Sequence, residues 1–191
     1  MTKGQLREKY RERMLKISGE ERLQKSRNAC SNLISTPQFR DSSVIMIFLS
    51  MPAEVDTTEA IRYAWQQGKT IAAPKVFWKQ KSMVPVRIDS LEEGFKIEES
   101  GLRNPITNKE VPVSKIELIV IPALVFDRNG HRVGRGGGFY DKFLANGKLK
   151  AIKCGFGFAE QLMENEYIPA GQKDIRLDLL VTDKEVLYFS N

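Results

Sequence analysis

The stretch GHRVGRGGGFYD, from Gly130 to Asp141, combines bare backbone with charge. Four of the five residues at 134–138 are glycine, and the fifth is Arg135. Glycine lets a ligand approach the backbone closely, and successive N–H groups can form a cradle for an anion. Arg132 and Arg135 can neutralise phosphate oxygens through paired hydrogen bonds. The stretch therefore predicts a phosphate-binding loop; a flexible loop with incidental charges is the alternative.

This loop departs from the usual phosphate-binding motifs. It contains no GxxxxGK[ST], and Phe139 stands where GxGxxG would place its third glycine. Tyr140 and Asp141 follow, at the predicted start of a helix whose N-terminus adds partial positive charge. Asp141 is either a Mg²⁺ ligand or an acid of the first helical turn. Asp178, which opens a late strand, is the second candidate, because Mg²⁺ takes only one or two carboxylates and keeps several waters.

Glu54 is a further candidate because it follows a buried apolar run, residues 44–49, and precedes a helix. In open α/β sheets, ligands bind beyond the carboxyl ends of strands, so Glu54 could face the same cleft as the glycine loop. The alternative is a polar helix entry, which is the stronger interpretation for Asp56 and Glu59. The only histidine, His131, has no nucleophile partner, whereas phosphoryl transfer by positioning and electrostatics needs none.

The N-terminal segment predicts an amphipathic, basic helix. Lys3, Arg7 and Arg11 recur every four residues beside an apolar stripe. They either stand at the rim of a cleft or form a solvated face. The chain as a whole carries a net charge of +6, with a pI of about 9.3, which favours anionic partners such as nucleotides, nucleic acids or polyanionic small molecules.

Length and composition predict one domain over residues 1–191, with enough apolar residues, 41%, to bury a core. No apolar run approaches the roughly 20 residues of a membrane span, and the N-terminus lacks the apolar region of a signal peptide. Cys30 and Cys154 belong to no CxxC pair, so we expect thiols in a reducing cytoplasm rather than a zinc site or a disulfide.

Hydrophobic periodicity predicts helices and strands in alternation. Because the central strands are apolar throughout, we expect an α/β fold with a mainly parallel sheet flanked by helices. The segment 89–114 is polar and is expected to form surface loops. The predicted helices span 3–16, 18–35, 57–67, 139–145 and 159–165, and the predicted strands span 44–49, 70–76, 83–88, 116–126, 151–158, 177–183 and 185–190, the last two joined in a hairpin.

Taken together, these stretches resemble one family, the 5-formyltetrahydrofolate cyclo-ligases or 5,10-methenyltetrahydrofolate synthetases. The matching motifs are KGQLR, IFLSMPAEVDT, IELIVIPALVFDRNGHRVGRGGGFYDKFL, FGFAEQ and LDLLVTD, in this order along nearly the whole chain. The resemblance implies a fold similar to that of sugar-phosphate isomerases and CoA transferases. It also implies a cytoplasmic enzyme of folate and one-carbon metabolism that requires ATP and Mg²⁺. Such an enzyme phosphorylates the formyl oxygen of 5-formyltetrahydrofolate, and attack by N10 then yields 5,10-methenyltetrahydrofolate, ADP and phosphate.

The resemblance also implies roles for single residues by their positions in these motifs. The implied ATP-binding residues are Lys3, Arg7, Arg132, Gly134, Arg135, Gly136, Gly137, Gly138, Phe139 and Tyr140. The implied folate-binding residues are Leu49, Glu54, Arg135, Gly136, Gly137, Gly138 and Phe139. The implied catalytic residues are Glu54, Arg135 and Tyr140, and the implied Mg²⁺ ligands are Asp141 and Asp178.

The sequence departs from the family pattern at three places. Lys173 and Asp174 stand where many members carry His-Asp, residues 101–106 lack an acidic-Pro pair, and Phe139 replaces a common tyrosine. Two other functions remain open: a nucleic-acid-associated protein that uses the basic N-terminal helix, and another ATP-dependent kinase or ligase. The chain lacks the aromatic RNA-binding signature that would support the first of these functions. The expected partner is therefore 5-formyltetrahydrofolate, with or without a polyglutamate tail, bound by a monomer that contacts neither membrane nor nucleic acid.

Overall fold

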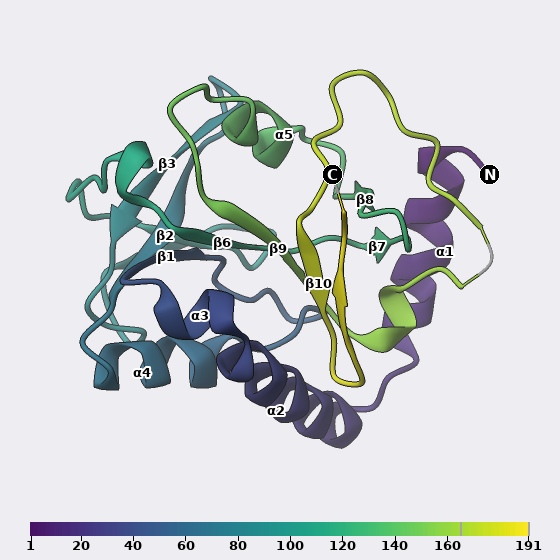
Figure 1. Ribbon diagram of the computed structural model, residues 1–191, viewed down its shortest axis with the longest axis horizontal. Coiled ribbons are helices and arrows are strands. Elements are labelled where there is room, and N and C mark those ends of the chain that lie inside the picture. Colours follow the sequence, from purple (N-terminus) through teal and green to yellow (C-terminus); the bar gives the residue numbers. More distant parts are fainter. Residues whose placement is uncertain (165, 191) are drawn as a thin grey trace.

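A seven-stranded sheet forms the centre of the fold, in the order β11-β10-β9-β6-β1-β2-β3 (Figure 1). The computed structural model describes residues 1–164 and 166–190. The five inner strands run parallel, while β3 and β11 pair antiparallel at the two edges. The predicted α/β class with a mainly parallel sheet is thus confirmed. The strands of this sheet are β1 (Val44–Ile47), β2 (Thr70–Phe77), β3 (Ser82–Arg87), β6 (Leu118–Ile121), β9 (Ile152–Phe156), β10 (Leu179–Val181) and β11 (Val186–Tyr188).

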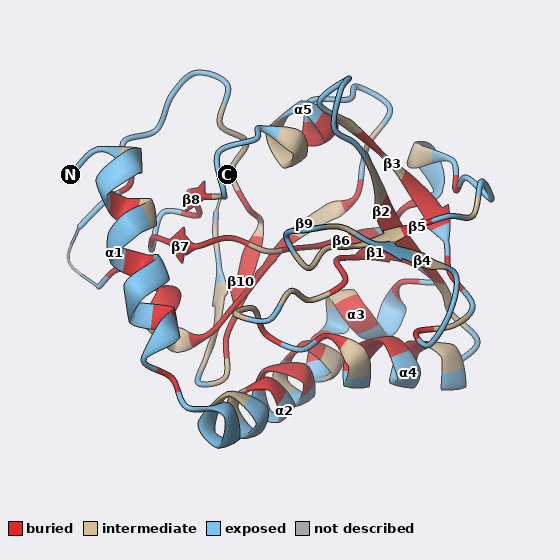
Figure 2. Cartoon of the chain, turned by 180° about the vertical axis from the view of Figure 1, so that it is seen from behind, coloured by how far each residue is buried: buried red, intermediate tan, exposed pale blue. Residues whose placement is uncertain are grey.

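Three of the inner strands, β1, β6 and β10, are apolar throughout because both faces of the sheet are covered. Along β1, Ile45 and Ile47 point to one core layer and Met46 to the other, as the two-residue period of a strand requires. The first layer contains α2 (Gly19–Ser35), α3 (Pro37–Asp41) and α4 (Thr58–Gln66), and the second contains α5 (Phe139–Leu144). Figure 2 shows the buried strands between these two helical layers.

Local capping explains where the helices begin. The helix α1 (Lys3–Leu15) starts with a capping box between Thr2 and Gln5, and Ser18 accepts a hydrogen bond from the Glu21 amide at the start of α2. Pro37 follows the end of α2 and begins a further short helix. It occupies the first turn of α3, where its missing N–H has no intrahelical partner to lose.

The predicted strand 116–126 is wrong in its second half. The β6 strand ends at Ile121, because Pro122 cannot donate to the strand ladder. The chain then forms a separate hairpin of β7 (Val125–Phe126) and β8 (Arg132–Val133) before it reaches the glycine loop. The α1 helix packs on this hairpin through a small apolar cluster that includes Leu6 and Tyr10. The α1 helix thereby lies next to β7 and β8, as Figure 1 shows, and its Arg7 side chain reaches the glycine loop.

Three smaller predictions have different outcomes. The segment 89–114 contains a two-stranded hairpin of β4 (Phe95–Ile97) and β5 (Arg103–Pro105), and a 3₁₀ turn, η1 (Val113–Lys115), follows it. The predicted helix 159–165 is only a 3₁₀ turn, η2 (Ala159–Gln161), and its last residue lies outside the described residues. The β10–β11 hairpin is confirmed. No helix in the described ranges is long and apolar enough to cross a membrane.

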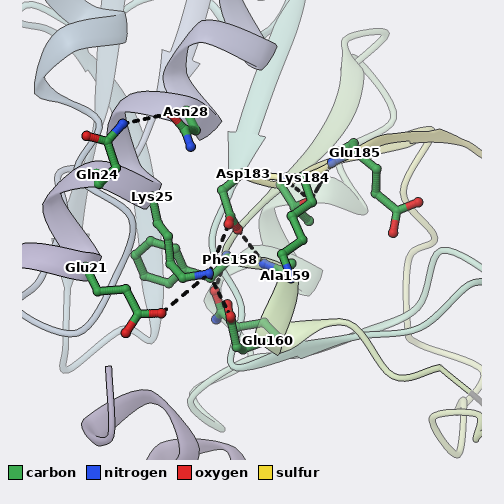
Figure 3. Close-up of polar contacts among 12 residues, drawn as sticks. Glu21, Gln24, Lys25, Asn28, Phe158, Ala159, Glu160, Asp183, Lys184 and Glu185 are labelled. Carbon is green, nitrogen blue, oxygen red and sulfur yellow. Dashed lines mark hydrogen bonds and ion pairs between the residues drawn. The ribbon is translucent and has the colours of Figure 1, made fainter. Parts of the chain in front are cut away.

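An ionic cluster joins α2 to η2 and to the turn between β10 and β11 (Figure 3). The Lys25 Nζ lies 2.7 Å from Glu160 Oε1 on η2 and 3.1 Å from Asp183 Oδ2 in the β10–β11 turn. Asp183 also accepts a 2.7 Å hydrogen bond from the Ala159 amide. Gln161, the last residue of η2, is buried, and its Nε2 donates to the Ala123 carbonyl at 2.6 Å. The cluster therefore anchors the turn that supports the loop after β6.

Candidate active site

A cleft of about 340 Å³ opens beyond the carboxyl ends of β1 and β6. Its floor is made by the residues that follow these strands, Phe48 and Leu49 after β1 and Pro122 and Ala123 after β6. This is the position at which open α/β sheets bind ligands. The remaining lining residues are Lys3, Arg7, Met51, Glu54, Pro74, Val76, Trp78, Met83, Ser100, Leu102, Arg103, residues 132–141 and Asp174.

The glycine loop is shaped by backbone that only glycine adopts easily. Gly136 and Gly138 have φ angles of 103° and 69°, in the left-handed region. Gly138 starts α5, and the side chain of Arg7 packs against Gly136. The Arg7 Nε donates to the Gly134 carbonyl at 2.9 Å. The loop is thus held by the N-terminal helix, and its exposed backbone faces the cleft.

Arg132 is the buried cation of the site. Its guanidinium donates to the Asp141 Oδ1 at 2.6 Å and to the Ile175 carbonyl at 2.5 Å. Its side chain is only 4% exposed, whereas that of Asp141 is 37% exposed. Arg132 is therefore fixed in place by two acceptors, and Asp141 keeps one side open to the cleft.

The second carboxylate of the cleft is Asp174. It pairs with Lys3 and accepts a 2.6 Å hydrogen bond from the Gly171 amide. Burial alone would raise the pKa of Asp174, but the hydrogen bonds from Lys3 and from the Gly171 amide lower it below its ordinary value. The carboxylate is thus kept charged next to the N-terminal helix.

The expectation that Asp178 joins Asp141 at this site is not met. Asp178 pairs with Lys153 across the β9–β10 register, accepting from its amide at 2.7 Å and from its Nζ at 2.8 Å. It does not line the cleft. The reason is topological: Asp178 precedes β10, so it lies at the opposite end of that strand from the carboxyl edge.

Glu54 and Arg135 face each other across the cleft. Both the Arg135 Nε and its terminal nitrogen approach the Glu54 Oε1, at 3.3 and 3.0 Å. The Glu54 Oε2 accepts from the Met51 amide at 3.0 Å, which orients the carboxylate. Tyr140 lies nearby, and burial, with a contribution from the negative charge of Glu54, raises the pKa of its hydroxyl. Tyr140 therefore remains a neutral hydrogen-bond donor at physiological pH.

Part of the cleft lining is aromatic and apolar. The rings of Trp78 and Phe139 meet edge to face, with their centroids 5.3 Å apart. A Cβ atom on Gly137 would come within 2.6 Å of the Phe139 ring, so that glycine allows the ring to fold back over the loop. With Leu49 and Met83, these rings form a wall suited to a flat heterocycle.

The structure gathers nearly all of the predicted residues. Lys3, Arg7, Leu49 and Glu54 line the cleft with the loop from Arg132 to Asp141.

Two residues noted in the sequence, Arg11 as a third cation and His131 without an expected site role, do not reach the cleft. Arg11, the third cation of the predicted row, is exposed on α1, outside the lining. His131 instead contacts the buried Asp127, in the turn between β7 and β8. Three cleft residues were not predicted from the sequence: Asp174, Trp78 and Arg103. The family's His-Asp position was the signal available for Asp174.

The carboxylates present suit a hydrated Mg²⁺ ion. Asp141 and Asp174 are both partly exposed, line the same cleft, and are each paired with a cation that would also face a phosphate. Mg²⁺ is bound in proteins through one or two carboxylates and substrate phosphates, with waters completing its shell. Within 1–164 and 166–190, no three acidic, histidine or cysteine side chains gather into a metal cluster. Asp141 and Asp174 are the pair of cleft carboxylates that could hold such an ion.

The fold and the cleft together define an α/β protein with a cationic ligand-binding cleft at the carboxyl ends of its parallel strands. Comparison with known proteins makes the identification specific. A model of the 5-formyltetrahydrofolate cyclo-ligase family matches residues 1–183. The chain belongs to this family.

Individual relatives match the chain over most of their length. The 5-formyltetrahydrofolate cyclo-ligase of Mus musculus is 32% identical over 194 aligned positions, which cover 96% of this chain and 91% of the relative. That of Escherichia coli K12 is 27% identical and covers 92% of this chain and 97% of the relative. The solved structure of Aquifex aeolicus 5,10-methenyltetrahydrofolate synthetase has a TM-score of 0.84 at 29% identity and covers 100% of this chain and 94% of its own.

Proposed function

We propose that this protein converts 5-formyltetrahydrofolate and MgATP into 5,10-methenyltetrahydrofolate, ADP and phosphate. The observation that carries the proposal is that one cleft combines cationic and aromatic lining. Lys3, Arg7 and Arg132 supply positive charge, while Trp78 and Phe139 supply an aromatic surface. Such a cleft suits a triphosphate and a pterin bound side by side, in a protein of a family named for this reaction.

The first chemical step joins the two substrates. The formyl oxygen attacks the γ-phosphorus of ATP, a new P–O bond forms, and the bond to ADP breaks. Negative charge spreads over the transferring phosphoryl oxygens, and positioned cations stabilise it. Arg132 is suited to this role because Asp141 and Ile175 already fix its guanidinium, so little reorganisation is needed.

The second step closes the ring. N10 of the folate attacks the activated formyl carbon, the N10–H proton leaves, and the C–O bond breaks to release phosphate. Glu54 is placed to accept this proton, since its carboxylate lies in the cleft and is oriented by the Met51 amide. Arg135 would hold that carboxylate and the departing phosphate together, and the Tyr140 hydroxyl would donate to a phosphate oxygen.

Asp141 and Asp174 are the residues proposed to hold Mg²⁺. When bound, the ion would neutralise charge on the phosphate oxygens of the nucleotide. Lys3 and Arg132, which pair with these carboxylates, would add further positive charge at the same end of the cleft.

We also propose that the enzyme works as a monomer in a reducing compartment such as the cytoplasm. The residues assigned above line one cleft within a single chain. Cys30 and Cys154 are free and buried. The net charge of +6 favours anionic substrates, including a polyglutamylated folate.

The proposal is tested by following the ultraviolet absorbance of the methenyl product with purified protein, 5-formyltetrahydrofolate and MgATP. We expect product to appear only with all three, and one ADP to form for each product. ATP binding without any product would reject the cyclo-ligase activity and favour a related ATP-dependent enzyme with another small substrate.

A further inference from the structure

We propose that Asp127 is a positioning residue. It fixes the geometry of the cationic part of the cleft, lined by Arg132, Asp141 and Asp174 and here called the phosphate end. The inference rests on the function proposed above. Asp127 lies in the turn between β7 and β8 and does not line the cleft. Its side chain is fully buried. A buried carboxylate is unfavourable unless hydrogen bonds compensate for the lost water, so its partners indicate what it holds in place.

The two oxygens of Asp127 bind two different parts of the chain. Oδ1 accepts from the amides of Asn129 and His131, at 3.0 and 2.8 Å, and so shapes the turn of its own hairpin. Oδ2 accepts from the Ile168 amide at 3.0 Å and lies 3.3 Å from the His131 Nδ1. One side chain thus joins the β7–β8 turn to a segment that lies about forty residues further along the chain.

Each of the two joined segments carries a residue that lines the phosphate end of the cleft. The β8 strand begins with Arg132, directly after this turn, and the later segment continues to Asp174 and Ile175. Arg132 itself bridges the two by donating to the Ile175 carbonyl. Asp127 therefore fixes, relative to each other, the two backbone segments that carry Arg132 and Asp174.

Two further contacts join the same segments, at their other end. The Leu177 amide donates to the Gly130 carbonyl at 2.9 Å, and the Arg176 Nε donates to the Asn129 carbonyl at 2.8 Å. These contacts would keep the segments associated if the Asp127 contact were lost. Loss of Asp127 should then shift the geometry of the phosphate end rather than unfold the protein.

The substitution Asp127→Asn separates the two functions of the carboxylate. The asparagine oxygen can keep the two Oδ1 contacts to Asn129 and His131. Its NH₂ group would then face the Ile168 amide, and two donors cannot form a hydrogen bond. The hairpin turn is retained, while the link to the later segment is lost.

The experiment measures ATP binding directly, by calorimetry with MgATP, and in parallel the KM values for ATP and for 5-formyltetrahydrofolate. For D127N we expect the Kd and the KM for ATP to rise about 10- to 100-fold, as when an outer partner of a ligand-binding group is removed, with the folate KM within about twofold. The stability control is Thr36→Val, which removes a buried hydroxyl at the start of α3, outside the cleft. T36V should lower the melting temperature and leave both KM values unchanged.

A second variant decides the matter if D127N does not fold. His131→Ala removes only the imidazole contact to Oδ2, so we expect it to fold and to raise the Kd for ATP about threefold, less than D127N because the stronger amide contacts remain. Unchanged ATP binding in folded D127N, or in H131A if D127N is unfolded, would overturn the positioning role. Equal rises in both KM values would overturn it as well. Absence of turnover in the wild-type protein would instead reject the proposed function, and the binding measurement would still test Asp127.

Discussion

Asp174→Asn should abolish most Mg²⁺-dependent turnover while leaving the fold intact. The variant removes the negative charge of the second carboxylate that lines the cleft. Loss of even an outer partner of a metal ligand lowers metal affinity or activity about 10- to 100-fold, so we expect kcat/KM to fall by at least this factor. The ion pair with Lys3 is partly exposed, so its loss should change the free energy of unfolding by only roughly 0–1 kcal/mol.

Asp178→Asn is the matched control, because it removes the same charge four positions away. The Asp178 side chain bonds only the amide and the Nζ of Lys153 among the described contacts, and it lies outside the cleft. Its loss should lower the stability by about 1 kcal/mol, the net contribution of such a hydrogen bond. For a chain of this size, that corresponds to a fall of roughly 2–4 °C in the melting temperature. Turnover should stay within about twofold of the wild type, since the site is untouched.

The assay follows product absorbance while Mg²⁺ is titrated at fixed ATP and folate, with a thermal melt of each variant. We expect the Mg²⁺ requirement of the Asp174 variant to increase and that of the Asp178 variant to stay unchanged. The reverse pattern, with turnover lost in D178N and kept in D174N, would refute the assignment of the second carboxylate.

Two further substitutions test the proposed proton acceptor, Glu54, and the ionic cluster of Lys25 that anchors η2. Glu54→Gln should lower kcat about 100-fold through loss of the proposed proton acceptor, while ATP, whose proposed contact is Arg132, should bind normally. Lys25→Met leaves two carboxylates of the α2–η2 cluster, Glu160 and Asp183, without their cation, and should lower the free energy of unfolding by about 3 kcal/mol. Although burial alone would raise the pKa of Glu160, Lys25 lowers it, so this stabilisation is present above the ordinary carboxyl pKa and is lost as the pH falls through the lowered value.

The controls for these substitutions separate chemistry from folding. Glu54→Asp keeps the charge but shortens the side chain, so partial recovery of kcat would support a proton acceptor, and full activity in Glu54→Gln would exclude it. For Lys25→Met, chemical denaturation at several pH values should show the gap to the wild type narrowing in acid. A gap that is constant with pH would contradict the role of the Glu160 charge.

The central strands could be predicted from the sequence because their chemistry is local. Residues 44–49 and 118–121 are apolar without interruption, as burial on both faces demands. The glycine loop was predictable for a similar reason, since the left-handed backbone at Gly136 and Gly138 favours glycine over other residues. These features depend on short stretches whose physical requirements do not change with the rest of the fold.

The choice between Asp174 and Asp178 could not be made in this way. Both are acidic and close in sequence, and which of them faces the cleft depends on how the segment before β10 crosses the hairpin. The run 116–126 was misjudged for a related reason. Pro122 ends the sheet ladder, and Ala123 finds its hydrogen-bond partner in the side chain of Gln161, far along the chain.

The most direct test of the proposed reaction follows the formyl oxygen itself. The substrate is 5-formyltetrahydrofolate carrying a heavy oxygen isotope in the formyl group, and the released phosphate is analysed by mass spectrometry after one turnover. Because the formyl oxygen attacks the γ-phosphorus and later leaves with it, we predict that the heavy isotope appears in the phosphate in step with the methenyl product. Methenyl product accompanied by unlabelled phosphate would contradict the proposed chemistry.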